Sequence, residues 1–349
     1  MSGEPTLIVS YSGVLGGAER ILLDCATRLR TPVLLACPVG PLATAAKEAG
    51  LAHAPVPERS LRLRGARIAH ARAAAAVARD VAALSRRHRP RAVGAWGARA
   101  VLAAGVIPRR PPVLAVHMDL LPSGGVALAV RAATRRAQGV AAASEAIAEA
   151  VGGGIVLHPG VDLAAWTPEP PPAPNPPRAL VLGALVPWKR PDLALEVAAR
   201  IPALQLELAG APIPGDAQEF EVRLRERAAQ PDLAGRVTFL GSLPDPRPAL
   251  ARAHCLLHCA DAEPWGLALV EALAAGRPVV AADAAGPREI VADGAGRRFP
   301  PGDAAAAAAA LQAVLADPAA PAAARARAEM FPVAASAARF EAALEAVAR

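Results

Sequence analysis

The sequence predicts an α/β protein with two Rossmann-like, doubly wound domains that face a central cleft. Its 349 residues exceed one ordinary domain and fit two, because domains cluster near ~100–150 residues. Short β-rich runs alternate with helical runs in both halves, which is typical of βα units around a parallel sheet. A proline-rich segment, 167–178, stands between the two halves. Together these observations place ligands at the carboxyl ends of parallel strands.

The first domain is predicted over residues 1–166. A helix is expected from about Gly17, and strands are expected over 7–11, 32–36, 92–96, 113–117 and 139–143. Residues 167–178 contain too many prolines for a helix or a central strand, so we interpret them as a semi-rigid linker and as the domain boundary.

The second domain is predicted over residues 179–332, where the alternation begins again. Expected strands cover 179–183, 205–209, 237–240, 255–258 and 278–282, and alanine-rich helices cover 304–315 and 319–330. The remaining residues, 333–349, are expected to form a last helix that packs back on the first domain.

The net charge of +7 favours anionic partners, such as a sugar nucleotide, a phosphorylated acceptor or an anionic lipid. Nucleic acid is disfavoured, because aromatic residues make up only 3% of the chain and no stacking platform is visible. The chain has only two lysines, Lys47 and Lys189, among 38 basic residues. Because a lysine ammonium and an arginine guanidinium are not interchangeable, a lysine in a chain whose other basic residues are arginines indicates a position that requires lysine itself.

We expect neither a targeting segment nor a membrane-spanning segment. The strand-like run 6–11 begins too early for a signal peptide, and arginines interrupt the apolar stretches. We therefore expect a cytoplasmic protein, with peripheral contact at the inner membrane face left open.

Four cysteines, Cys25, Cys37, Cys255 and Cys259, lack paired C-x-x-C spacing, so core packing is their expected role. His254 and His258 flank two of them, which suggests a metal site. Successive side chains of a strand alternate faces, however, so these four residues cannot converge on one ion. We expect neither a metal nor a cofactor.

The segment 262–280 carries the strongest functional signal. It follows a buried strand, turns at Pro-Trp-Gly and starts a helix, so the backbone amides of Gly266, Leu267 and Ala268 can form an anion site. Glu271 lies five residues beyond Gly266, a rise of about 7.5 Å, which suits a ribose beside a diphosphate. Glu263, before the turn, would then hold sugar hydroxyls. Lone glutamates are more often solvated charges, but this context favours binding.

This segment resembles the Glu-x7-Glu signature of the family-four retaining glycosyltransferases, which have the GT-B fold of two Rossmann-like domains. Residues 15–20, 158–162 and 284–291 resemble the family's first-domain glycine loop, end-of-domain turn and diphosphate-facing loop. The resemblance covers most of the chain and weakens between about 55 and 112. It implies a retaining, metal-independent glycosyltransferase that moves a sugar from a nucleotide diphosphate sugar to an unidentified acceptor.

The resemblance also assigns individual roles. Lys189 sits where the family neutralises the donor diphosphate, and His117 sits near the donor sugar, where it would be catalytic together with Glu263. The family's arginine beside the preceding glycine is replaced here by Ala184. Arg190, counted among the donor-binding residues, is one candidate for the missing charge; the alternatives are an exposed Arg190 at a helix start and a donor that is bound more weakly.

The roles of several further residues are open. Arg288 is a second candidate for the charge missing at position 184. Asp119 is a weaker candidate for a base or nucleophile, and Tyr11, the single tyrosine, is interpreted as structural. Gly16 and Gly17 follow the first strand, where their backbone can approach a phosphate or a sugar, although a bare turn fits equally well.

Basic residues are concentrated in the stretch Arg59, Arg62, Arg64, Arg67, Arg72, Arg79, Arg86, Arg87, Arg89 and Arg91. Such a run is usually a solvated helix face; contact with an anionic acceptor or a membrane surface is the functional alternative. For the whole chain, the other functional hypotheses are a non-catalytic sugar-nucleotide-binding protein and a GT-B epimerase or phosphorylase.

Overall fold

The computed structural model forms two compact units, Met1–Gly160 together with Val333–Arg349, and Val161–Pro332. It describes residues 4–58, 67–105, 107, 111–121, 123–170, 172–173, 175–213 and 217–349, with only the backbone of 67–74 and 217. Arg59, Arg62 and Arg64 of the basic stretch lie outside this range, as do the side chains of Arg67 and Arg72.

In its described part, the first unit contains a parallel sheet in the order β3-β2-β1-β4-β5-β6-β7. This is the strand order of a Rossmann fold, with the order reversing between β1 and β4. The strands are β1 (Thr6–Ser10), β2 (Val33–Cys37), β3 (Ala52–Pro55), β4 (Ala92–Trp96), β5 (Val113–His117), β6 (Gly139–Ala142) and β7 (Ile155–Val156). The helices are α1 (Gly17–Ala26), α2 (Pro41–Glu48), α3 (Arg67–His88), α4 (Ala98–Gly105), α5 (Gly125–Thr134), α6 (Glu145–Val151) and α14 (Val333–Ala348).

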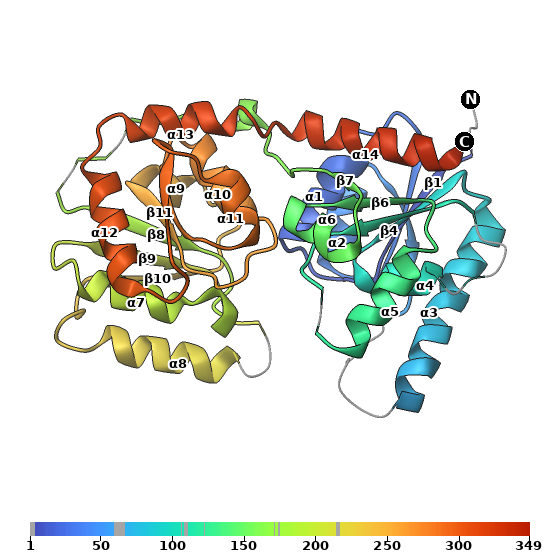
Figure 1. The fold of residues 1–349 in the computed structure, drawn as a ribbon, viewed down its shortest axis with the longest axis horizontal. Coiled ribbons are helices and arrows are strands. Elements are labelled where there is room, and N and C mark those ends of the chain that lie inside the picture. The colour runs from blue at the N-terminus through green and yellow to red at the C-terminus, as the bar shows by residue number, and fades with distance from the viewer. Residues whose placement is uncertain are drawn as a thin grey trace. The chain divides into compact units, whose positions relative to one another are not determined.

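Helices cover both faces of this sheet (Figure 1). Strands β1, β2, β4 and β5 are buried at every position, as expected for strands covered on both sides. Helix α4 packs on β1, β4 and β5, and helix α14 packs on β4, β5, β6 and α1. The Trp96 and Phe340 rings meet edge to face, with 5.5 Å between their centroids. Residues 333–349 thus complete the core of the first unit.

The described part of the second unit repeats this topology in the order β10-β9-β8-β11-β12-β13. Its strands are β8 (Arg178–Leu182), β9 (Gln205–Ala209), β10 (Val237–Gly241), β11 (Cys255–His258), β12 (Val279–Ala282) and β13 (Gly296–Phe299). The helices are α7 (Pro191–Ala199), α8 (Ala217–Ala228), α9 (Arg247–Arg252), α10 (Leu267–Ala274), α11 (Ala285–Ile290), α12 (Ala304–Leu315) and α13 (Ala320–Ala328).

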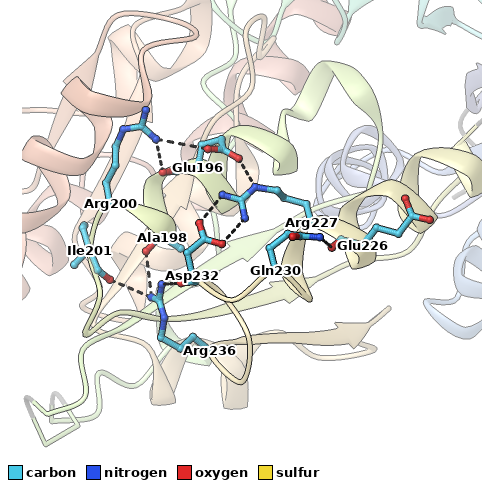
Figure 2. A network of polar contacts seen from close by, with 9 residues as sticks. All are labelled: Glu196, Ala198, Arg200, Ile201, Glu226, Arg227, Gln230, Asp232 and Arg236. Carbon is cyan, nitrogen blue, oxygen red and sulfur yellow. Dashed lines mark hydrogen bonds and ion pairs between the residues drawn. The ribbon is translucent and has the colours of Figure 1, made fainter.

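An arginine network joins helices α7 and α8 to the loop before β10 (Figure 2). Arg227 binds Glu196 of α7 through Nε at 2.6 Å and Asp232 through both terminal nitrogens at 2.9 and 2.8 Å. Arg236 donates to the carbonyls of Ala198, Ile201 and Leu204. The network fixes the end of α7 with donors that cannot lose their charge at neutral pH.

The boundary between the units differs from the predicted one. The segment 167–178 was expected to separate the domains, whereas the second unit already begins at Val161. The described part of this segment is held against the second unit. The buried guanidinium of Arg277 donates to the carbonyls of Glu169 and Pro170, and the His254 ring contacts the Ala173 carbonyl. Prolines lack N–H donors, so a proline-rich segment offers carbonyls, which Arg277 satisfies.

Within the described residues, no helix is long and apolar enough to cross a membrane. All four cysteines are free and buried, as expected for core residues. In α3, Val77 and Val81 are buried while Arg79, Arg86 and Arg87 are exposed. The described arginines of the basic stretch therefore lie on the solvent side of this helix or beyond its end.

Candidate functional site

The candidate site lies at the carboxyl ends of β8 and β11, the neighbouring strands between which the order of the second sheet reverses. Ligands of doubly wound proteins bind at this switch point, because the loops leave the two strands in opposite directions and open a crevice. The loop after β8 carries Lys189, and the loop after β11 carries Glu263. The fold thus brings together two of the residues singled out in the sequence.

Lys189 ends a short 3-10 turn, Pro187–Lys189, that follows β8. Its ammonium lies 4.4 Å from the centroid of the Trp188 ring, which is 46% exposed. The loop starts at Gly183, and Gly210 of the neighbouring strand end packs so closely that a Cβ there would collide with the Gly183 carbonyl. This close approach fixes the start of the loop that carries Lys189.

The backbone of Glu263 is held by the loop after β12. The Gly286 amide donates to the Glu263 carbonyl at 3.0 Å, and a Cβ on Gly286 would collide with the backbone of Trp265. Gly266 then turns the chain into α10 with φ of +106°, a conformation that side chains disfavour. Both glycines are needed for the turn, and both were part of motifs found in the sequence.

The carboxylate of Glu263 is almost fully buried, and two donors meet on one of its oxygens. Lys189 Nζ lies 2.5 Å from Glu263 Oε2, and His258 Nε2 lies 3.0 Å from the same atom. Burial by itself raises the pKa of Glu263, but the hydrogen bond and charge of His258 and the charge of Lys189 outweigh it and lower the pKa to about 2. Glu263 is therefore an anion at neutral pH.

Helix α10 begins beside this pair. Its amides at Leu269 and Val270 bond to the Gly266 carbonyl, whereas Leu267 and Ala268 precede the first intrahelical bonds and are partly exposed. Their N–H groups and the helix dipole favour an anion at this end. Glu271 lies half-buried on the same helix. The predicted donor-binding residues Gly266, Leu267 and Ala268 thus lie at the start of α10, shortly after Glu263, and Glu271 lies one turn further along the helix.

The two arginines expected to compensate for Ala184 are already engaged. Arg190 contacts Asp261 at 3.0 Å and Asp192 at 3.1 Å. Although burial alone would lower the pKa of Arg190, these two carboxylates raise it. Arg288 bonds Asp283 at 3.1 Å. Lys189 is therefore the cation that lies directly beside Glu263.

The glycine loop of the first unit contains an acid at its helix start. The Gly16 amide donates to the Glu19 carboxylate at 3.0 Å, and the Trp96 indole donates to the Ala18 carbonyl. A Cβ on Gly17 would meet nothing within 4 Å, so packing within this unit does not require a glycine there. The Tyr11 hydroxyl donates to the Val77 carbonyl at 2.8 Å, which is a structural contact.

His117 ends β5 in the first unit and is 2% exposed. Its Nε2 lies 3.0 Å from the Thr134 hydroxyl, which itself donates to the Val130 carbonyl. The hydroxyl must therefore accept from His117, so Nε2 carries the proton. Burial lowers the pKa of His117 to about 4, which keeps the ring neutral. The ring of His117, which we expected near the donor sugar, thus bonds through Nε2 to Thr134 of helix α5. Asp119 is exposed beyond the strand.

His258 is the member of the cluster for which the sequence pattern suggested a different role. We considered it only as a metal ligand, yet its ring bonds Glu263, while the His254 ring accepts from the Arg178 amide. These two rings therefore serve different partners. A histidine at the end of a buried strand, five residues before Glu263, was the available signal.

Comparisons with known proteins agree with this architecture. Residues 165–330 match the family model described as "Glycosyl transferases group 1". Anabaena HepE, solved in complex with UDP and glucose, superimposes with a TM-score of 0.83 and 26% identity over 97% of this chain and 99% of that one. The chain has the GT-B fold. A sucrose-phosphate synthase from Thermosynechococcus elongatus shares this GT-B fold with a TM-score of 0.75 and 20% identity, over 99% of this chain and 96% of that one.

Curated relatives match only part of the GT-B chain. The D-inositol 3-phosphate glycosyltransferase of Mycobacteroides abscessus is 34% identical over 140 residues, or 36% of this chain and 30% of the relative. The enzyme of the same name from Mycolicibacterium gilvum is 36% identical over the same length and shares. The chain thus spans about a third of the length of these relatives. The matches relate the chain to the group 1 glycosyltransferases.

Proposed function

We propose that this GT-B protein is a glycosyltransferase that takes a sugar from a nucleotide diphosphate sugar and transfers it with retention of anomeric configuration. The observation that carries the proposal is the position of Lys189 and Glu263 at the switch point of the second sheet, beside the start of α10. A lysine and helix amides suit a diphosphate, and a fixed carboxylate suits sugar hydroxyls.

The leaving group in such a transfer is a nucleoside diphosphate, whose negative charge grows as the glycosidic bond breaks. Lys189 and the amides of Leu267 and Ala268 would stabilise that charge in a site whose dipoles are already oriented. These groups do the work that a divalent cation does in other transferases, so we propose a metal-independent reaction. The diphosphate oxygen would take the proton of the acceptor hydroxyl as the new bond forms.

Glu271 and Glu263 lie on opposite sides of the turn at Gly266, which supports different tasks. Glu271, further along α10, would accept the ribose hydroxyls, and Glu263 would accept hydroxyls of the transferred sugar. In the first unit, the Glu19 carboxylate at the Gly16 amide favours neutral hydroxyls over a second phosphate. We therefore propose that the Gly16–Gly17 loop approaches a sugar.

UDP-glucose is the first donor to test, because HepE was solved with UDP and with UDP-glucose. The relatives named D-inositol 3-phosphate glycosyltransferases make inositol phosphate a reasonable anionic acceptor for a first panel. Lipid-linked acceptors belong in the same panel, since the exposed arginines of α3 would suit an anionic surface.

A binding and turnover assay tests the proposal. UDP, GDP, ADP and dTDP sugars are screened by thermal shift, and the best donor is then incubated with acceptor mixtures and analysed by mass spectrometry. We expect sugar nucleotides with one particular base to raise the melting temperature of the protein. One acceptor of the mixture should then gain the mass of a sugar. Proton NMR of the product reports the anomeric configuration, and EDTA should leave the rate unchanged.

The alternatives give different results in this assay. An epimerase or phosphorylase would consume the donor without an acceptor, or with phosphate alone. A non-catalytic binder would bind a sugar nucleotide but transfer to no acceptor, and the variant Glu263→Gln would then have no turnover to lose.

A further inference from the structure

The carboxylate of Glu263 is held asymmetrically. Both of its donors, Lys189 Nζ and His258 Nε2, meet on Oε2. Among the described residues, neither of the two hydrogen bonds to this carboxylate involves Oε1. The side chain of Glu263 is 8% exposed and that of His258 is 5% exposed, whereas that of Lys189 is 22% exposed. The histidine is thus the enclosed donor, and the lysine is the accessible one.

We propose that His258 is a positioning residue that holds Glu263 through Oε2, so that Oε1 is presented to the hydroxyls of the donor sugar while Lys189 turns to the diphosphate. This inference rests on the proposed function, which it deepens by naming the group that orients Glu263. His258 acts through Glu263 and does not itself contact the sugar.

The need for a second donor follows from the task of Lys189. The ammonium of Lys189 is bound to Glu263, but a diphosphate attracts the same ammonium with more charge. Once Lys189 turns away, a buried carboxylate with no other donor would be strongly disfavoured. His258 remains on Oε2 and prevents this. Because the ionised carboxylate can only accept, the histidine donates through Nε2–H.

The backbone around both residues is fixed, so the contact can be maintained. His258 is the last residue of β11 and pairs in register with Ala281 of β12. The Glu263 carbonyl is bound by the Gly286 amide. The main chain thus sets where the glutamate lies, and the histidine sets which oxygen faces outward.

Two variants separate positioning from folding. His258→Leu removes the donor within a similar volume, and His258→Gln keeps an amide N–H that can reach Oε2. UDP lacks the transferred sugar and probes Lys189 and α10, whereas UDP-glucose also probes Glu263. We expect His258→Leu to bind UDP within about twofold of the wild type but to lose roughly 10- to 100-fold in kcat/KM for the sugar donor, as for a lost charge-assisted contact. His258→Gln should recover most of this loss.

A second measurement needs no donor. Carbon-13 NMR titration of the Glu263 carboxyl should show its pKa near 2 in the wild type and clearly higher in His258→Leu, with His258→Gln in between. Equal loss of UDP and UDP-glucose binding, or an unchanged pKa of Glu263 in folded His258→Leu, would overturn the inference. If the wild type binds no sugar nucleotide while the pKa shift is seen, the proposed function fails and the orienting contact stands.

Discussion

Lys189 Nζ and Glu263 Oε2 lie 2.5 Å apart although 74 positions separate them in the chain. The parallel pairing of β8 with β11 places the ends of the two strands side by side, and glycines fix the loops that follow. The pair joins the residue assigned to the diphosphate with the residue assigned to the sugar. Changes at this contact should therefore affect donor binding before they affect the fold.

Lys189→Met should weaken binding of UDP about 10- to 100-fold, because a hydrogen bond to a charged group is worth about 1.5–3 kcal/mol. Calorimetry with UDP measures the effect. Lys47→Met is the matched control, since Lys47 is the only other lysine and lies on α2 of the first unit. Equal affinities of the two variants would contradict the assignment of Lys189 to the diphosphate.

Gly286→Ala should destabilise the protein by about 1–3 kcal/mol and disturb the Glu263 loop, because the added Cβ would collide with the Trp265 backbone. Chemical denaturation measures the loss. Gly17→Ala is the contrasting variant, since its Cβ would meet nothing within 4 Å. Its stability should be unchanged or higher by up to about 1 kcal/mol. A loss of donor or acceptor binding in this stable variant would support close approach of a ligand to the loop.

His117 should make the protein sensitive to mild acid. Burial lowers the pKa of His117 from 6.5 to about 4. Between these two pH values the histidine is protonated in the unfolded chain but neutral in the folded protein. The free energy of unfolding should therefore fall by about 1.4 kcal/mol per pH unit from pH 6.5 to about 4 on account of this residue. Above pH 6.5 the contribution is constant.

The variant His117→Gln isolates that effect, because glutamine does not titrate. Urea denaturation of both proteins at several pH values gives the two slopes. The difference in slope should disappear above pH 6.5, and parallel curves throughout would show that the ring is accessible to protons in the folded state.

Arg277→Met should destabilise the second unit by about 2–5 kcal/mol. The guanidinium is 1% exposed and donates to the carbonyls of Leu250 and Ala251 as well as to those of the proline-rich segment. Its loss leaves buried acceptors unsatisfied, each at a cost of about 1–3 kcal/mol. Arg297→Met, at an exposed position of β13, should change stability by less than about 0.5 kcal/mol. Proteolysis within 167–178 should become faster in Arg277→Met alone.

Much of the fold was predictable, because the spacing of apolar residues along the sequence indicates which positions of a strand or helix are buried. The strands at 92–96, 113–117, 205–209 and 255–258 have the predicted bounds. Strands β3, β7 and β13 were not predicted, since they are short edge strands, partly exposed, with weak apolar runs. The boundary between the units differed from the predicted one for a related reason. The proline content of 167–178 indicates a stiff backbone, but it does not show that a buried arginine of the second unit binds the segment.

The sequence by itself determined the two Rossmann-like repeats and the turn at Gly266, and it singled out Lys189 and Glu263 as candidates, because these inferences depend on local patterns and on rare residues. Only the tertiary structure decided that His258 bonds Glu263 and that Arg190 is neutralised by Asp192 and Asp261. It also decided that the His117 ring is bound to Thr134. Such pairings depend on which strand ends and helices become neighbours in the folded chain, and a hydrogen bond between loops leaves no periodic signal in the sequence.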